Sequence, residues 1–120
     1  MPRTQKKAAR RVPLMLHQKA LAEMRSSLDA GAQADVAWVF QQLEGSDVTF
    51  IQSFLDKRTD RKVAQFEGSH PAGTLRVVFA WGKGCLWFIG AFVKVNDREG
   101  ERYMRRILPR ADEVRGQGVS

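Results

Sequence analysis

The sequence has 120 residues, of which 43% are hydrophobic, and 20 Lys and Arg against 13 Asp and Glu give a formal net charge of +7. This length allows one compact domain, and the hydrophobic content excludes a wholly disordered chain. No apolar stretch approaches the length of a membrane span or follows the basic start as a secretory signal does, so we expect a cytoplasmic protein. The single Cys85 cannot form an internal disulfide, and no Cys or His cluster has metal-ligand spacing, so neither a metal nor another cofactor is expected.

Charge is unevenly distributed along the chain. Residues 1–11 hold five basic side chains and no acid, residues 12–50 have a net charge of −3, and residues 51–120 have a net charge of +5. The basic second half favours a polyanionic partner such as a nucleic acid. We expect residues 1–11 to form a flexible tail, residues 12–115 a single domain, and residues 116–120 a second flexible tail.

The first half of the domain is predicted to be mainly helical. An apolar run over residues 12–16 is a candidate strand, which its proline confines to a sheet edge or to the strand's start. Helical spacing of apolar residues predicts a helix from His17 that stops at Gly31, and a second helix over residues 32–43. Their short connection predicts an antiparallel hairpin of helices. Residues 48–55 fit a helix and a strand equally well.

The second half is predicted to be mainly strand. Alternating residues indicate a strand over residues 62–67, followed by a loop over residues 68–73 that contains two glycines and a proline. Two strongly apolar strands follow, Leu75–Trp81 and Cys85–Val95, joined by a tight Gly-Lys-Gly hairpin. These three strands are expected to form an antiparallel meander.

The last periodic segment is predicted to be a helix that begins at Asp97 and that Pro109 ends or kinks. The order of elements predicts an α+β fold, in which an N-terminal helix hairpin packs on a small antiparallel sheet and a C-terminal helix follows. We expect the helices to cover one face of that sheet.

The stretch TLRVVFAWGKGCLWFIGAFVKV, followed by NDREGERYMRRIL, carries an ordered set of motifs. Arg76 opens the penultimate strand, a glycine-containing hairpin follows, the last strand ends in Phe-x-Lys at Lys94, and a charged helix comes next. From about Lys62 to Ile107 this order resembles the RelE/ParE superfamily of bacterial toxins, above all its HigB-like and phage-encoded branch. Gly90 stands where HigB-like proteins usually have a histidine.

The resemblance implies a RelE-like fold and the toxin component of a bacterial type II toxin–antitoxin system. Such a toxin is a metal-independent endoribonuclease that cleaves messenger RNA, often on the ribosome, and an antitoxin protein neutralises it. Two alternatives remain open from the sequence. One is a toxin-fold protein that acts by binding, like the gyrase-directed ParE branch or an inactive relative. The other is a small basic nucleic-acid-binding protein, phage-derived and unrelated to the toxins.

Cleaving RNA without a metal requires a base for the ribose 2′-OH, cations for the added negative charge, and an acid for the leaving oxygen. Arg76 is the candidate stabiliser, because a planar guanidinium can bind phosphate through two hydrogen bonds. Its structural alternative is an ion pair with Glu67 on the neighbouring strand. Further candidate catalytic residues, by resemblance and position, are Lys94, Arg98, Tyr103 and His70.

Candidate RNA-binding cations lie in two clusters, one ahead of the meander and one on the last helix. These are Lys57, Arg58, Arg61, Lys62, Arg102, Arg105 and Arg106. Acidic residues lie near each cluster, so the alternative to RNA binding is that these cations form ion pairs on a solvated surface. Tyr103 also has one, because it is spaced to pack on the sheet. His17 and Cys85 are predicted to be structural.

Overall fold

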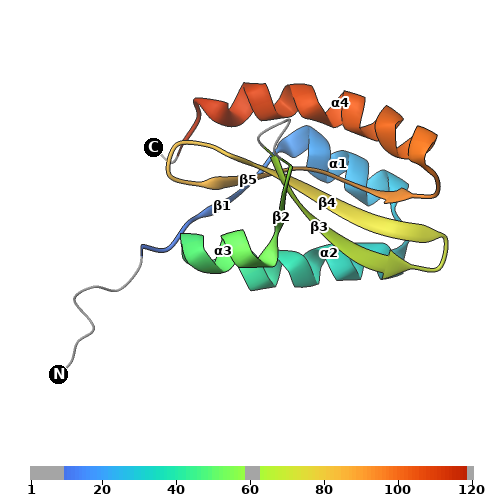
Figure 1. Cartoon of the computed structure of the whole chain (residues 1–120), viewed down its shortest axis with the longest axis horizontal. Coiled ribbons are helices and arrows are strands. Elements are labelled where there is room, and N and C mark those ends of the chain that lie inside the picture. Colours follow the sequence, from blue (N-terminus) through green and yellow to red (C-terminus); the bar gives the residue numbers. More distant parts are fainter. Residues whose placement is uncertain (1–9, 59–62, 119–120) are drawn as a thin grey trace.

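The computed structural model describes residues 10–58 and 63–118, which form a five-stranded sheet and four helices (Figure 1). The strands are β1 (Leu14–Leu16), β2 (Asp56–Arg58), β3 (Val63–His70), β4 (Gly73–Trp81) and β5 (Leu86–Lys94). The helices are α1 (Gln18–Ser27), α2 (Ala30–Leu43), α3 (Val48–Phe54) and α4 (Asp97–Arg115). The predicted α+β class and the predicted C-terminal helix are confirmed.

The strands lie in the order β1-β5-β4-β3-β2, with β4 at the centre. Strands β2 to β5 form an antiparallel meander, while β1 adds to β5 in parallel, as a strand connected by a long crossover can. The register places Arg76 of β4 directly between Glu67 of β3 and Phe92 of β5, and it places Thr74 opposite Lys94. Directly opposed side chains share a face of the sheet, so all five project toward α4.

Helices cover both faces of the sheet, with α2 and α3 on one side and α4 on the other (Figure 1). On β4, Val77 and Phe79 belong to the core shared with α1, α2 and α3, whereas Val78 and Ala80 belong to the core beneath α4. Burying each large apolar side chain stabilises the fold by roughly 1.5–3 kcal/mol. The expectation that helices cover only one face is wrong, and the continuous apolar run of β4 is the reason: both faces need cover.

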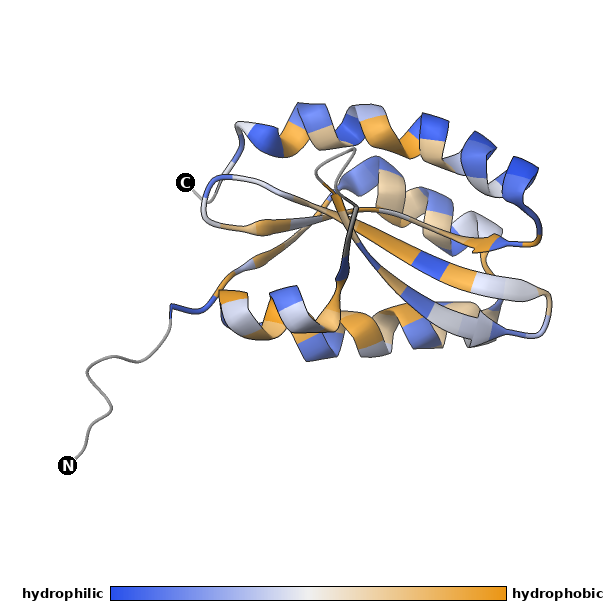
Figure 2. Cartoon of the chain, viewed as in Figure 1, coloured by the Kyte–Doolittle hydropathy of each residue, from blue (hydrophilic) through white to orange (hydrophobic). Residues whose placement is uncertain are grey.

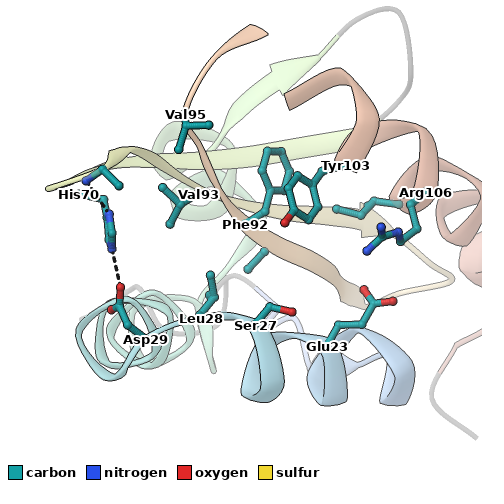
Figure 3. Close-up of a pocket in the computed structure, with 13 residues that line it drawn as sticks. Glu23, Ser27, Leu28, Asp29, His70, Phe92, Val93, Val95, Tyr103 and Arg106 are labelled. Carbon is teal, nitrogen blue, oxygen red and sulfur yellow. Dashed lines mark hydrogen bonds and ion pairs between the residues drawn. The ribbon is translucent and has the colours of Figure 1, made fainter. Parts of the chain in front are cut away.

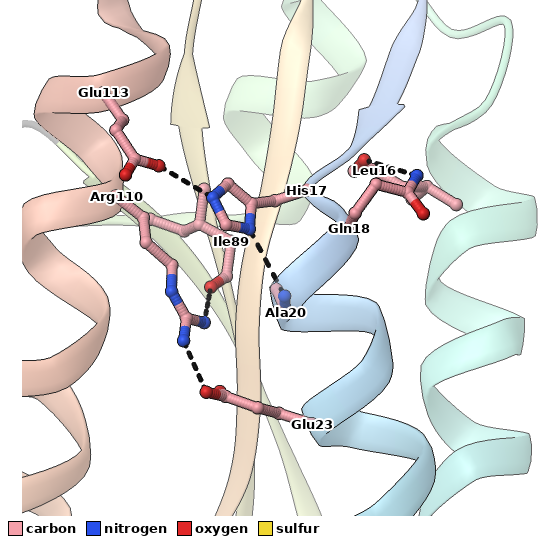
Figure 4. A network of polar contacts seen from close by, with 8 residues as sticks. All are labelled: Leu16, His17, Gln18, Ala20, Glu23, Ile89, Arg110 and Glu113. Atoms are coloured by element: carbon pink, nitrogen blue, oxygen red, sulfur yellow. Dashed lines mark hydrogen bonds and ion pairs between the residues drawn. The ribbon is translucent and has the colours of Figure 1, made fainter.

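Helix α1 lies along the outer side of β5, because β1 covers only the first three residues of that strand. A polar network holds α1 to α4 (Figure 4). His17 caps α1 with Nδ1, which accepts from the Ala20 N–H at 3.3 Å, and its Nε2 donates to Oε1 of Glu113 at 2.8 Å. Glu23 of α1 accepts from Arg110 of α4 at 2.6 Å. The structural role predicted for His17 is therefore confirmed.

Short polar side chains set the starts of the other helices. Asp29, Asp47 and Asn96 are the N-caps of α2, α3 and α4, and each accepts a 2.8 Å hydrogen bond from the backbone N–H three residues later. Because Asp29 starts α2, the predicted stop at Gly31 is wrong and this glycine lies inside α2. The ambiguous segment after Asp47 is helical for the same reason.

The connection between β3 and β4 is shorter than predicted. Gly68 lies inside β3 and Gly73 begins β4, so the turn consists of Pro71 and Ala72 alone. Gly73 has a φ of 158°, and a Cβ atom there would lie 2.1 Å from the carbonyl oxygen of Lys94. Glycine therefore lets the hairpin lie directly against the end of β5.

Two further elements differ from the sequence-based expectations. Strand β2 was not predicted, since three residues are too few to show an alternating pattern. Helix α4 does not end at Pro109 but continues to Arg115. Pro109 lies on the exposed side of α4, where water can satisfy the carbonyl that loses its hydrogen bond.

Parts of both expected tails pack on the domain. Arg11 pairs with Asp47 through the backbone, and its guanidinium donates to the carbonyl of the turn that precedes α3. The carbonyl of Gln117 accepts from the backbone N–H of Lys83 at 3.0 Å. Residues 1–9 and 119–120 of these tails lie outside the described residues.

Candidate functional site

Arg76 is a largely buried cation on the face of the sheet that α4 covers. Its side chain is 16% exposed, and its Nε lies 2.9 Å from Oε2 of Glu67, the residue directly opposite on β3. The two atoms are not aligned for a hydrogen bond, and within the described residues this buried Nε has no hydrogen-bond partner. The expected ion pair with Glu67 is present, but it leaves donor capacity on Arg76 for another anion.

Arg110 provides a comparison, because it is a buried arginine whose hydrogen bonds show a structural role. It is 5% exposed, and its Nη1 donates to the carbonyl of Ile89 at 2.9 Å while its Nη2 donates to Glu23 at 2.6 Å (Figure 4). These bonds tie α4 to β5 and to α1. Among residues 10–58 and 63–118, Arg76 makes no comparable bond through its Nε, which makes it the better candidate of the two to bind a ligand.

Lys94 brings a second cation to the same end of the sheet. Its Nζ lies 2.7 Å from Oδ1 of Asp97, the first residue of α4. The hydrogen bond from Lys94, followed by the charges of Lys94 and of Arg76, lowers the pKa of Asp97 below its ordinary value. Both cations therefore act on one carboxylate. A Cβ at Gly100 would lie 3.1 Å from Cγ of Lys94, so this glycine gives the lysine stem room to cross α4.

Helix α4 presents a basic ridge on its outer side, formed by Arg98, Arg102 and Arg105. Their spacing of four and three residues places them on one side of the helix, and all three are exposed. Arg102 lies 3.7 Å from Glu99, an exposed pair of the kind that contributes little to stability. The ridge begins one residue after Asp97, so its first arginine adjoins the Lys94 end of the site.

Tyr103 packs on the sheet instead of standing free beside Arg76. Its ring stacks on Phe92 at a centroid distance of 4.8 Å and an interplanar angle of 8°. The guanidinium carbon of Arg106 lies 5.4 Å from the centroid of the same ring. Phe92, the residue on which Tyr103 stacks, is the β5 residue directly opposite Arg76.

His70 projects to the opposite face, because residues alternate along β3 and Glu67 faces α4. Its Nδ1 accepts from the Ala72 N–H at 3.0 Å, which leaves the ring proton on Nε2, and Nε2 donates to Oδ2 of Asp29 at 2.8 Å. The backbone N–H of Ala32, followed by His70, lowers the pKa of Asp29. His70 thus fastens the β3–β4 hairpin to the start of α2.

His70 and Tyr103 both line a groove of about 200 Å³ along the outer side of β5 (Figure 3). Arg106 lines it from α4, and Glu23 lines it from α1. The candidate catalytic residues therefore form two groups. Arg76 and Lys94 lie on the α4 face of the sheet, whereas His70 and Tyr103 line the groove beside β5.

Sequence reasoning did not find Gln65, a neighbour of the site. This residue is 7% exposed, and its Nε2 donates to Oε2 of Glu67 at 3.3 Å. Its Oε1 has no hydrogen-bond partner among residues 10–58 and 63–118. The available signal was the alternation in β3, where polar Gln65 and Glu67 flank apolar Phe66 and so indicate a polar stripe facing α4.

The cluster of basic residues ahead of the meander is only partly described. Lys57 and Arg58 belong to β2, where their backbones pair with β3. Arg61 and Lys62 lie outside the described residues. Contact between these four cations and phosphate stays a prediction.

Comparisons with protein-family models, curated proteins and solved structures found no match to this chain. In the described segments, no helix combines the length and apolar character needed to cross a bilayer. The same segments bring no three His, Cys, Asp or Glu side chains together as a metal site.

Proposed function

We propose that this chain is the toxin component of a bacterial type II toxin–antitoxin system and cleaves messenger RNA, on the ribosome, without a metal. One observation carries the proposal: the largely buried Arg76 lies beside a carboxylate and a second cation, Lys94, yet keeps donor capacity on its guanidinium. Natural proteins rarely leave such a group unsatisfied without a functional reason.

The chemistry required is attack of a ribose 2′-OH on the adjacent phosphorus. The hydroxyl proton passes to a base as the new P–O bond forms, and the P–O5′ bond then breaks to leave a 2′,3′-cyclic phosphate and a 5′ oxygen that takes its proton from water. Arg76 and Lys94 oppose the charge that develops on the phosphorane. Our candidate for the base that accepts the hydroxyl proton is Glu67, which lies 2.9 Å from Arg76 and is 37% exposed.

The basic ridge of Arg98, Arg102 and Arg105 extends this site along α4 and supplies contacts to neighbouring phosphates. An acidic antitoxin segment that covers the ridge and the Arg76–Lys94 end would neutralise the toxin. Attraction between such charges acts mainly on the association rate, and salt weakens it.

A second candidate is a toxin-fold protein that acts by binding alone, for which gyrase is the target in the ParE branch. The ion pairs favour this reading, because Glu67 partly neutralises Arg76 and Asp97 partly neutralises Lys94 before any ligand arrives. Bound RNA would have to compete with both carboxylates for these cations.

Induced expression tests the proposal. We expect growth arrest that co-expression of an adjacent reading frame relieves, together with new 5′ ends in cellular messages mapped by primer extension. Growth arrest without new RNA ends would favour action by binding. No arrest under full induction would contradict both candidates.

A further inference from the structure

Four aromatic side chains form a continuous patch on the side of the sheet away from α4. Phe50 and Phe54 of α3 stack at a centroid distance of 5.5 Å, and Phe54 stacks on Phe66 of β3 at 5.5 Å. Trp38 of α2 lies 5.9 Å from Phe54 and 6.0 Å from Phe66. We call these four residues the aromatic patch. Figure 2 shows hydrophobic segments on α2 and α3, the two helices that lie together on this side.

The aromatic patch is open to solvent. Trp38 is 48% exposed and Phe50 is 40% exposed, and the adjacent Val48 is 41% exposed. In the described part of the chain, the only other large hydrophobic side chain this exposed is Val95, at the end of β5. Apolar side chains that gather at one place on a surface mark an interaction site, and Trp and Phe are among the residues that dominate such interfaces.

Acidic side chains accompany the two most exposed rings. Asp35 lies three residues before Trp38 on α2, and Asp47 lies three residues before Phe50 at the start of α3, so each carboxylate is the helical neighbour of its ring. Within residues 10–58 and 63–118, neither aspartate forms an ion pair with a side chain. This arrangement favours a partner that carries Lys or Arg beside its apolar residues. It disfavours RNA, and it disfavours a second copy of the chain, whose own aspartates would face these.

The spacing of the rings matches a helical partner. Successive centroids lie 5.5 to 5.9 Å apart, close to the roughly 5.4 Å rise of one α-helical turn. Apolar side chains one turn apart on a helix can therefore each lie against one of the three rings Trp38, Phe54 and Phe50. This is how an amphipathic helix binds a hydrophobic surface.

We propose that the aromatic patch docks a protein partner through an amphipathic helix whose apolar side chains are flanked by Lys or Arg. The patch and the basic ridge of α4 lie on opposite sides of the sheet, so the docked partner leaves Arg76, Lys94 and the ridge open. This surface is independent of the proposed RNA cleavage, and either proposal can fail alone.

Calorimetry measures how two synthetic peptides bind to the full chain. The first is an amphipathic helix of Leu and Lys, and the second has Glu in place of every Lys. The wild type is expected to bind the Lys peptide and to bind the Glu peptide at least tenfold more weakly. Trp38→Ser with Phe50→Ser should weaken binding of the Lys peptide at least tenfold. Asp35→Asn with Asp47→Ser, which keeps a cap on α3, should remove the preference for Lys.

Val95→Ser is the matched control, since it removes an equally exposed apolar side chain outside the aromatic patch and should leave binding unchanged. Thermal melting confirms that each variant is folded. Equal binding of the Lys peptide by the wild type and the Trp38/Phe50 variant would overturn the proposal. Two other results would also overturn it. If the Trp38/Phe50 variant lost self-association that the wild type shows, the occupant would be a second copy of the chain. If the variant lost binding to a single-stranded RNA probe, the occupant would be RNA.

Discussion

Lys94 and Asp97 form a 2.7 Å ion pair across the turn that connects β5 to α4. The charge of Arg76 also lowers the pKa of the Asp97 carboxyl, so the arginine interacts electrostatically with this turn. The pair joins the end of the sheet to the start of the helix that carries the basic ridge.

The ion pair predicts a specific acid dependence of stability. Asp97 has an ordinary pKa of 3.8 and a lower pKa in the folded chain. Its contribution to folding stability is therefore complete above the ordinary value and is lost as pH falls through the folded pKa. Asp97→Asn should remove this part of the acid destabilisation while leaving the contribution of Asp29 in place. Thermal melting of wild type and variant across the acid range measures it, and identical pH profiles would contradict the assignment.

The contrast between two arginines predicts effects of different size on folding stability. Arg110→Met should destabilise the chain by about 2–4 kcal/mol, because the Ile89 carbonyl and Glu23 lose a buried partner. Arg76→Met should cost less, about 1 kcal/mol, because it breaks one ion pair with the 37% exposed Glu67 and no hydrogen bond of its Nε within the described chain. Urea unfolding of both variants provides the measurement. A larger loss from Arg76→Met than from Arg110→Met would reverse their assigned roles.

The surroundings of Gly90 leave no room for a larger side chain, including the histidine that the sequence resemblance leads one to expect there. A Cβ atom there would lie 2.5 Å from Cδ1 and 2.7 Å from Cγ1 of Ile107 in α4. Gly90→Ala should therefore cost about 1–3 kcal/mol, and Gly90→His should cost more. Adding Ile107→Ala should recover part of the loss, since it clears the space that the new side chain needs. A Gly90→His variant as stable as the wild type would show that α4 does not lie where we place it.

Burial predicts an unreactive thiol. Cys85 is fully buried, and desolvation raises the pKa of its thiol, so little thiolate is present at neutral pH. A disulfide reagent should modify Cys85 slowly in the native chain and rapidly in urea, as followed by absorbance. Rapid modification of the native chain would mean that this end of β5 opens readily.

Much of the fold was predictable from sequence because its strongest patterns are local. The apolar runs around Phe79 and Phe88 predict the two longest strands, and their antiparallel order alone predicts that Arg76 and Lys94 share one end of the sheet. Which face of the sheet a given side chain takes was harder to predict. A loop was expected from Gly68 onward, whereas β3 continues to His70, and that extra length sets which face the histidine takes.

The rest of the site depends on contacts between distant segments. No local pattern indicates that Tyr103 stacks on Phe92, or that Gln65 donates to Glu67 while its own amide oxygen has no partner in the described part of the chain. The partner of His70 is Asp29, 41 residues away in sequence. Such contacts form only when the sheet and the helices have packed, so composition and spacing alone do not reveal them.

Cleavage of a ribosome-bound message by the purified chain, mapped by primer extension, tests the central claim most directly. Arg76→Gln is compared with Arg25→Gln, a matched change at an exposed arginine of α1, and circular dichroism confirms that both variants fold. We predict that wild type and Arg25→Gln cut equally, while Arg76→Gln loses a factor of about 10² to 10³ in rate. A folded Arg76→Gln variant that cuts as fast as the wild type would contradict the assignment of this site.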